Sequence, residues 1–234
     1  MLSISGITKT FNAGTINEKT ALNGLSLKLE EGDFVTVIGG NGAGKSTMLN
    51  AVAGVFSVDE GNITIDGIDV TKLPEYKRAK YLGRVFQDPM TGTAANMQIE
   101  ENLALASRRG NHRTLRSGIS QKERAQYQEQ LKILELGLEF RMTSKVGLLS
   151  GGQRQALTLL MATLKKPRLL LLDEHTAALD PKTAAKVLEI TEKIVERDHL
   201  TTLMITHNMK AVSYTHLVRM REVSIILQKM ISKR

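Results

Sequence analysis

Residues 39–46 read GGNGAGKS and match the pattern G-x-x-x-x-G-K-[ST] of a phosphate-binding loop, or P-loop. The apolar run FVTVI at residues 34–38 predicts a buried strand before the loop, and residues 46–55 predict a helix after it. In this order the glycines let backbone N–H groups converge on an anion, and the helix adds the positive end of its dipole. We therefore expect an α/β fold that binds a nucleoside phosphate, rather than a glycine-rich turn that merely precedes a lysine.

Two side chains at the end of this loop have predicted roles of their own. Lys45 is placed to reach the β- and γ-phosphates of a nucleotide. Ser46 offers a hydroxyl to Mg²⁺, an ion that keeps several waters and takes few protein ligands. The residues of this segment that we expect to contact the nucleotide are Gly39, Asn41, Gly42, Ala43, Gly44, Lys45, Ser46 and Thr47.

A second segment, LLLLDE at residues 169–174, predicts a buried strand that ends in two carboxylates. Ligands of α/β proteins bind at the carboxyl edge of the strands, so both acids are expected near the P-loop. Asp173 would hold Mg²⁺, in part through a water of its hydration shell, and Glu174 would polarise the attacking water. Taken alone, the segment could equally be a strand that ends in two solvated acids.

The remaining pattern predicts strands that alternate with helices, which is typical of an α/β fold with a largely parallel core sheet. Residues 96–165 are mostly helical, with a basic loop at residues 107–120, and interrupt the alternation like an inserted subdomain. The further predicted strands are residues 2–8, 22–29, 63–65, 84–86 and 201–206, and the further predicted helix is residues 184–197.

Composition excludes several classes of protein. Cysteine is absent from the 234 residues, which rules out a disulfide framework, a thiolate metal site and a cysteine nucleophile. No apolar run approaches the roughly 20 residues of a membrane-spanning helix, so we expect a cytoplasmic protein. About half of the net charge of +8 lies in residues 219–234, and the charge therefore does not by itself indicate nucleic-acid binding.

The segment LSGGQ at residues 149–153 selects among the many P-loop proteins, because it resembles the signature motif of the ATP-binding subunits of ABC transporters. The other motifs of that family occur in the expected order along the chain, both before and after this segment, and the resemblance covers residues 2–210. It implies a P-loop NTPase of ABC type, in which a mixed sheet core carries an N-terminal antiparallel β subdomain and an inserted α-helical subdomain. The implied RecA-like core is about residues 1–95 and 166–210, and the implied helical subdomain is about residues 96–165.

The resemblance also implies roles for individual residues. Two subunits would meet head to tail with ATP between them, so that the signature segment of one subunit serves the ATP held by the P-loop of the other. The signature positions are Ser150, Gly151, Gly152 and Gln153. Asp180 is the aspartate of the family's D-loop motif, at residues 178–180, which would lie across the dimer near the opposite site. Catalysis would involve Lys45, Gln87, Glu174 and His207, with Gln87 also completing the Mg²⁺ sphere. Phe11 would stack on adenine.

Some of these residues have simpler interpretations. Ser150 could be only the N-cap of a helix, because serine is favoured at that position. Phe11 could be an aromatic residue of the core rather than a platform for the base. His207 could be an ordinary polar residue at the end of a strand.

Within the family, the chain most resembles ATPase subunits of tryptophan/tyrosine-type importers. The features that suggest this subgroup are His175 and the basic loop at residues 107–120. It implies ATP and Mg²⁺ as cofactors, a small solute such as an amino acid as cargo, and a place on the inner face of the membrane. The implied partners are a second ATPase subunit, permease subunits and a substrate-binding protein, with no nucleic acid. The alternative is a soluble ABC-type ATPase of nucleic-acid maintenance or translation, although the interval from Gln87 to Ser150 is too short for a long coiled coil.

After Lys210 the family pattern ends. Residues 211–217, AVSYTHL, look like the translation of a transposon end that is used to make sequencing libraries. We therefore expect residues 211–234 to be a foreign tail, in part or as a whole, and the closing strands of the domain to be missing. The alternative is a divergent C-terminal helix, whose apolar residues at helical spacing are Val223, Ile226, Leu227, Met230 and Ile231.

Overall fold

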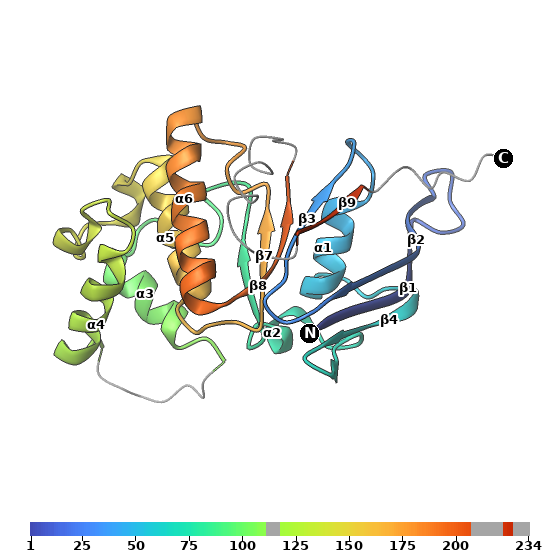
Figure 1. The fold of residues 1–234 in the computed structure, drawn as a ribbon, viewed down its shortest axis with the longest axis horizontal. Helices are drawn as coiled ribbons and strands as arrows, with labels where there is room; N and C mark the ends of the chain where they lie inside the picture. Colours follow the sequence, from blue (N-terminus) through green and yellow to red (C-terminus); the bar gives the residue numbers. More distant parts are fainter. Residues whose placement is uncertain (111–117, 207–221, 227–234) are drawn as a thin grey trace.

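A computed structural model of the chain describes residues 1–110, 118–206 and 222–226, and it contains two sheets and a block of helices (Figure 1). An antiparallel sheet has the order β2-β1-β4-β5. Its strands are β1 (Leu2–Phe11), β2 (Lys19–Leu29), β4 (Glu60–Ile65) and β5 (Ile68–Asp69). A second sheet has the order β6-β7-β8-β3-β9, and all of its pairs are parallel. Its strands are β3 (Phe34–Ile38), β6 (Leu82–Val85), β7 (Leu169–Asp173), β8 (Thr201–Ile205) and β9 (Glu222–Ile226).

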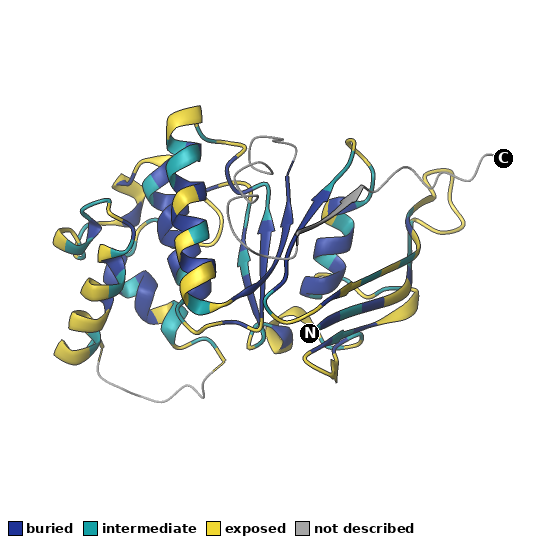
Figure 2. Cartoon of the chain, in the orientation of Figure 1, coloured by how far each residue is buried: buried dark blue, intermediate teal, exposed yellow. Residues whose placement is uncertain are grey.

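The parallel sheet is covered on both faces, as Figure 2 shows by its buried strands. In β7, Leu169 and Leu171 join the core that α1 (Lys45–Ala53) shares with the antiparallel sheet. Leu170 and Leu172 point to the other face and pack in the core of the helical block. Side chains alternate along a strand, so a four-leucine run satisfies two cores at once, and this explains why the segment has no polar face.

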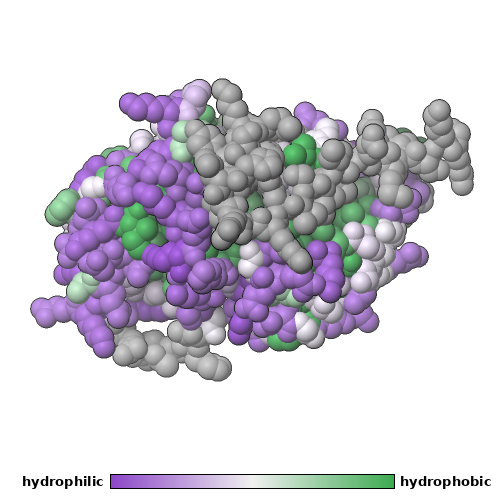
Figure 3. All heavy atoms as spheres, viewed as in Figure 1, coloured by the Kyte–Doolittle hydropathy of each residue, from purple (hydrophilic) through white to green (hydrophobic). Residues whose placement is uncertain are grey.

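The helical block contains α3 (Ile99–Ser107), α4 (Gln121–Lys132) and α5 (Gly151–Thr163), with short 3₁₀ turns at Leu138–Phe140 and Val146–Leu148. Outside it, α6 (Pro181–Asp198) packs against α5 and buries Val187, Ile190 and Ile194 at the spacing of one helical face. The opposite face of α6 is polar, and apolar side chains form only small patches on the side shown in Figure 3. These helices cover the second face of the parallel sheet, opposite α1 (Figure 1).

Most expected elements are confirmed, with ends that differ by a few residues. The strands at residues 34–38 and 169–173 have the predicted bounds, whereas β1, β2 and β4 are longer than predicted. The described part of the loop at 107–120 contains no helix after Ser107. The division into a core and a helical subdomain stays a prediction, since one hydrophobic cluster joins the sheet to these helices.

The C-terminal segment differs from the expectation at one place. Residues Glu222–Ile226 form β9, which pairs in parallel with β3. For these five residues the alternative of a C-terminal helix is wrong, and the edge of β3 is paired rather than open. The origin of residues 211–234 stays a prediction. Among the described residues, no helix combines the length and the apolar character that crossing a membrane requires.

Arg78 stabilises the helix behind the P-loop in a way that the sequence pattern did not predict. It ends the short helix α2 (Glu75–Arg78), and only 1% of it is exposed. Its guanidinium donates to the Ala51 and Val52 carbonyls in the last turn of α1, at 2.7 and 2.9 Å, and to the Leu73 and Thr71 carbonyls, at 2.7 and 2.9 Å. Burial lowers the pKa of Arg78, but an arginine stays charged, so these four acceptors compensate its desolvation.

We expect Arg78→Met to lower the free energy of unfolding by about 3 kcal/mol, because it leaves buried carbonyl groups without donors. Urea denaturation followed by circular dichroism measures this loss. Arg168→Met is the control, since Arg168 is exposed and its pair with Asp66 should contribute less than about 1 kcal/mol. Equal stability of the two variants would contradict the role of Arg78.

Candidate functional site

The P-loop forms one wall of a cavity of about 190 Å³ at the carboxyl edge of the parallel sheet, which we call the P-loop cavity. β3 leads into the loop and α1 leaves it, as the sequence predicted. The loop residues that line the cavity are Asn41, Gly42, Ala43, Gly44, Lys45, Ser46 and Thr47. Its other walls are Lys19, Ala21 and Glu174. The first turn of α1 therefore opens on a polar hollow, where its free N–H groups favour an anion.

Lys45 lies within this loop and is 5% exposed. Its Nζ donates to the Gly39 carbonyl at 2.7 Å and to the Gly40 carbonyl at 3.0 Å. Gly44, the N-cap of α1, has φ 86°, and a Cβ there would lie 2.5 Å from the Ala21 carbonyl oxygen. A glycine is thus required both by the left-handed turn and by the close approach of β2.

The two predicted acids lie at the end of β7, at the same edge of the sheet. Asp173 is the last residue of β7 and lies opposite Ile205 of β8 in the ladder. Glu174 lines the P-loop cavity, and its backbone N–H donates to the Ile205 carbonyl at 3.0 Å. Its φ of 46° turns the chain out of the strand, a conformation that is uncommon for a residue with a side chain. The structure thus brings Glu174 and the P-loop to one cavity from segments more than 100 residues apart.

The signature segment, residues 149–153, is at the start of α5 and none of it lines the P-loop cavity of its own chain. Ser150 is the N-cap: its Oγ accepts from the Gln153 N–H at 3.3 Å, and the Gln153 side chain accepts from the Ser150 N–H at 3.1 Å. The capping interpretation of Ser150 is therefore confirmed. Ser150 and Gly151 are nonetheless exposed, so the helix end remains open to an external anion.

Asp180 lies beside the signature segment rather than beside the P-loop. It is the N-cap of α6 and accepts from the Thr183 N–H at 3.1 Å, and hydrogen bonds to Thr183 lower the pKa of its carboxyl group. A Cβ on Gly152 would overlap the Thr183 methyl group, so glycine is required where α5 meets α6. The start of α5 and the start of α6 thus form one exposed corner of the molecule.

Three other predicted residues lie away from the P-loop cavity or outside the described chain. Gln87 is exposed just after β6 and does not line the cavity. The Phe11 ring packs edge to face on Phe56, with 5.3 Å between ring centroids, and it does not line the cavity either. His207 lies outside the residues that the structure describes.

Two side chains near the acids had no role assigned from the sequence. His175 is 2% exposed, its Nε2 lies 3.2 Å from the Thr191 Oγ1 on α6, and burial lowers its pKa to about 4. Arg84 on β6 pairs with Asp173, with 3.5 Å between Nη2 and Oδ2. A lone arginine in a strand carries no local signal of a partner on another strand, so only the fold reveals this pair.

Comparison with known proteins identifies the family to which this site belongs. The family model for ABC transporters matches residues 22–177. The chain is 45% identical to a tyrosine transport ATP-binding protein of Clostridioides difficile strain R20291. The alignment of 210 residues covers 90% of this chain and 83% of that protein. It is 35% identical to the lipoprotein-releasing system ATP-binding protein LolD of Ruegeria sp. TM1040, over 89% of each chain. It is 34% identical to the methionine import ATP-binding protein MetN of Bartonella henselae, of which it spans 59%.

Solved structures give the same result. The dimeric, post-hydrolysis structure of the ATP-binding cassette MJ0796 with ADP and Pi has a TM-score of 0.76 and 32% identity, over 90% of each chain. Another dimeric structure of MJ0796, described as a bacterial ABC transporter cassette, has a TM-score of 0.78 and 30% identity, over 97% of this chain and 95% of that one. With a P-loop, an acid pair and a signature helix in place, the chain belongs to the ABC transporter family as an ATP-binding and ATP-hydrolysing subunit.

Proposed function

We propose that this chain supplies the energy for import of an amino acid or a related compound, as the nucleotide-binding subunit of a membrane transporter. The observation that carries the proposal is the P-loop cavity, where loop N–H groups, Lys45 and Glu174 meet. The class of cargo rests on the C. difficile relative, whose name refers to tyrosine transport. The relatives favour this function over the soluble ATPase that the sequence left as an alternative.

The nucleotide would bind with its phosphates in the P-loop cavity. The Lys45 ammonium now donates to two loop carbonyls, and a γ-phosphate oxygen offers the same group a full negative charge. The start of α1 favours that charge further, because its first residues line the cavity and a helix N-terminus carries the positive end of the dipole. Phe11 is proposed to contact the adenine from β1, and His207 to contact the γ-phosphate.

The donor atoms around the acids fit Mg²⁺, which prefers hard oxygen ligands. The proposed ligands are the Ser46 hydroxyl, the Asp173 carboxylate and the Gln87 amide oxygen. Bound Mg²⁺ would neutralise charge on the β- and γ-phosphates. Glu174, which lines the cavity, would accept the proton of the attacking water.

A complete site would need a second subunit. The N-terminus of α5, with Ser150 and Gly151 exposed and Gly152 buried, lies outside the P-loop cavity of the same chain. A head-to-tail pair would bring it to the γ-phosphate that the partner holds, with Gln153 and Asp180 beside it. The dimeric state of the MJ0796 cassette supports this arrangement.

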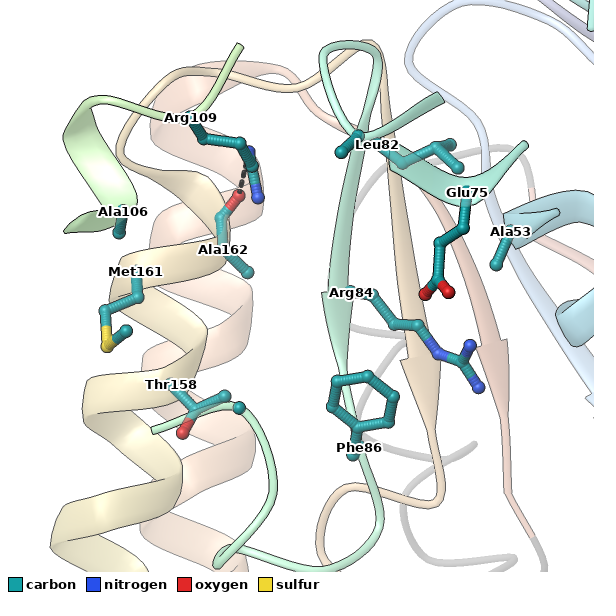
Figure 4. Close-up of a pocket in the computed structure, with 12 residues that line it drawn as sticks. Ala53, Glu75, Leu82, Arg84, Phe86, Ala106, Arg109, Thr158, Met161 and Ala162 are labelled. Carbon is teal, nitrogen blue, oxygen red and sulfur yellow. Dashed lines mark hydrogen bonds between the residues drawn. The ribbon is translucent and has the colours of Figure 1, made fainter. Parts of the chain in front are cut away.

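Transport also requires a permease, which we propose to dock near residues 87–102, between β6 and α3. A second cavity, of about 270 Å³, lies between the parallel sheet and the helical block, with Phe86 and Gly92 in its wall (Figure 4). We call it the sheet–helix cavity. Docking there would hold the subunit at the inner face of the membrane, and a substrate-binding protein would deliver the cargo from the other side.

We expect Lys45→Ala to weaken ATP binding about 10- to 100-fold, because a hydrogen bond to a charged group contributes about 1.5–3 kcal/mol. Equilibrium titration with a fluorescent ATP analogue measures the affinity. Lys77→Ala on α2 is the control, since it removes an equal charge from an exposed position outside the cavity. Unchanged affinity of Lys45→Ala would contradict the P-loop assignment.

Glu174→Gln should bind ATP normally but hydrolyse it about 100-fold more slowly or worse, because the amide cannot accept the proton of the water. Phosphate release under saturating ATP gives the rate. Glu129→Gln makes the same change on the outside of α4 and should leave the rate unchanged. Turnover by Glu174→Gln close to that of the unmodified chain would remove Glu174 from this role.

Ser150→Arg should keep the affinity for ATP and abolish hydrolysis, because the bulky cation fills the place where the partner's γ-phosphate would lie. The loss of a helix cap by itself costs about 1 kcal/mol. Ser120→Arg controls for this cost, since Ser120 caps α4 with the same reciprocal bonds to a residue three positions later. The composite site would be contradicted if Ser150→Arg hydrolysed ATP as fast as Ser120→Arg.

A further inference from the structure

Arg84 links three parts of the site that differ in function. It projects from β6, and its side chain is 14% exposed. Its Nη2 donates to the Asn50 Oδ1 on α1 at 2.6 Å, and its guanidinium carbon lies 4.5 Å from the centre of the Phe86 ring. The same Nη2 lies 3.5 Å from the Asp173 Oδ2. Arg84 therefore contacts α1 through Asn50, the residue before Gln87 through Phe86, and the carboxylate of Asp173 that we propose to bind Mg²⁺.

The contact with Asp173 is weak for an arginine and a carboxylate. Charge-assisted hydrogen bonds of this kind are normally about 2.7–2.9 Å and are frequently bidentate. Here a single nitrogen lies 3.5 Å from Asp173, and the same nitrogen donates to Asn50 at the shorter distance of 2.6 Å. Arg84 Nε is buried and makes no hydrogen bond within the described chain. The guanidinium thus keeps one donor unused, and its grip on Asp173 is partial.

The sheet–helix cavity gives this side chain room to move. Arg84 lines that cavity together with Phe86, Glu75 and Arg109. Figure 4 shows the Glu75 carboxylate pointing toward the Arg84 side chain, while Arg109 bonds to the Ala162 carbonyl further along the wall. A guanidinium that leaves Asp173 would therefore enter a space of about 270 Å³ whose wall carries the Glu75 carboxylate as well as the Arg109 cation.

We propose that Arg84 competes with Mg²⁺ for Asp173 and so sets the affinity of the site for the metal, with Arg84 moving into the sheet–helix cavity when the metal binds. The proposal rests on the metal role given to Asp173 above. Both side chains are about 85% buried, where salt screens their interaction less than at the surface. Arg84 is thus a positioning residue that acts through Asp173.

The test compares the metal affinity of Arg84→Met with that of the unmodified chain. Mn²⁺ replaces Mg²⁺ as the probe, and free Mn²⁺ is measured by electron paramagnetic resonance at saturating ADP, so no turnover is needed. Methionine retains the length of the side chain without its charge, and we expect three- to tenfold tighter Mn²⁺ binding. Arg168→Met is the matched control, because it breaks an exposed arginine–aspartate pair of 3.3 Å that includes neither Asp173 nor Glu174. This variant should bind Mn²⁺ as the unmodified chain does.

A second variant has an effect of opposite sign. Asn50→Ala removes the bond that holds Nη2 away from Asp173, so the ion pair should tighten and Mn²⁺ binding should weaken two- to fivefold. General damage to the site would weaken binding in both variants. If Arg84→Met binds Mn²⁺ with the same affinity as the control, or with a lower affinity, the proposed competition between Arg84 and the metal is overturned. If Arg84→Met fails to fold, an unchanged or tighter Mn²⁺ affinity of Asn50→Ala overturns it instead.

The same titration separates this inference from the proposed function. If the unmodified chain binds ADP and Mn²⁺ together but Arg84→Met does not differ, only the competition fails. If the unmodified chain binds ADP with no Mn²⁺, the metal role of Asp173 fails, and the competition fails with it.

Discussion

The ladder that places β8 between β3 and β7 determines the geometry of the whole site. Its backbone pairs Val37 with Ile205 on one side and Asp173 with Ile205 on the other, and all these strands run in the same direction. The carboxyl ends of β3 and β7 therefore lie at one edge, one strand apart. Because the P-loop follows β3 and Glu174 follows β7, the ladder brings the P-loop and Glu174 to a common cavity.

Two hydrophobic cores hold this ladder rigidly. One packs α1 between the parallel sheet and the antiparallel sheet, and the other packs the helical block on the opposite face. Arg78 fastens the far end of α1 through backbone carbonyls, so the helix that presents the P-loop is fixed at both ends. Arg84 then joins that helix to Asp173 across the sheet. The two cores thus leave one partly bonded cation, Arg84, beside the carboxylate that we propose to hold the metal.

The sequence predicts the parts of this fold that depend on local pattern. β3 and β7 have their predicted bounds because each is a short, mostly apolar run that ends at glycines or acids. The P-loop is predicted because its residues are contiguous, and Glu174 because it follows a buried strand, whereas Lys19 and Ala21, which also line the cavity, carry no such local signal. Arg78 and Arg84 were missed because their partners on other elements differ in type and lie far along the chain, 26 and 27 residues away for Arg78 and 34 and 89 residues away for Arg84. Apolar residues at mixed spacing could not distinguish strand from helix at residues 222–226, where pairing with β3 decides for a strand.

The central claim is that each ATP site combines the P-loop of one chain with the signature segment of another. Mixing Lys45→Ala with Ser150→Arg tests it most directly, by the rate of phosphate release from the mixture. A mixed dimer contains one complete site, formed by the intact P-loop of the Ser150→Arg chain and the intact signature segment of the Lys45→Ala chain. The account predicts that the mixture hydrolyses ATP at a measurable fraction of the unmodified rate, although neither variant does so alone. A mixture that is no more active than the two variants measured separately would contradict the composite site.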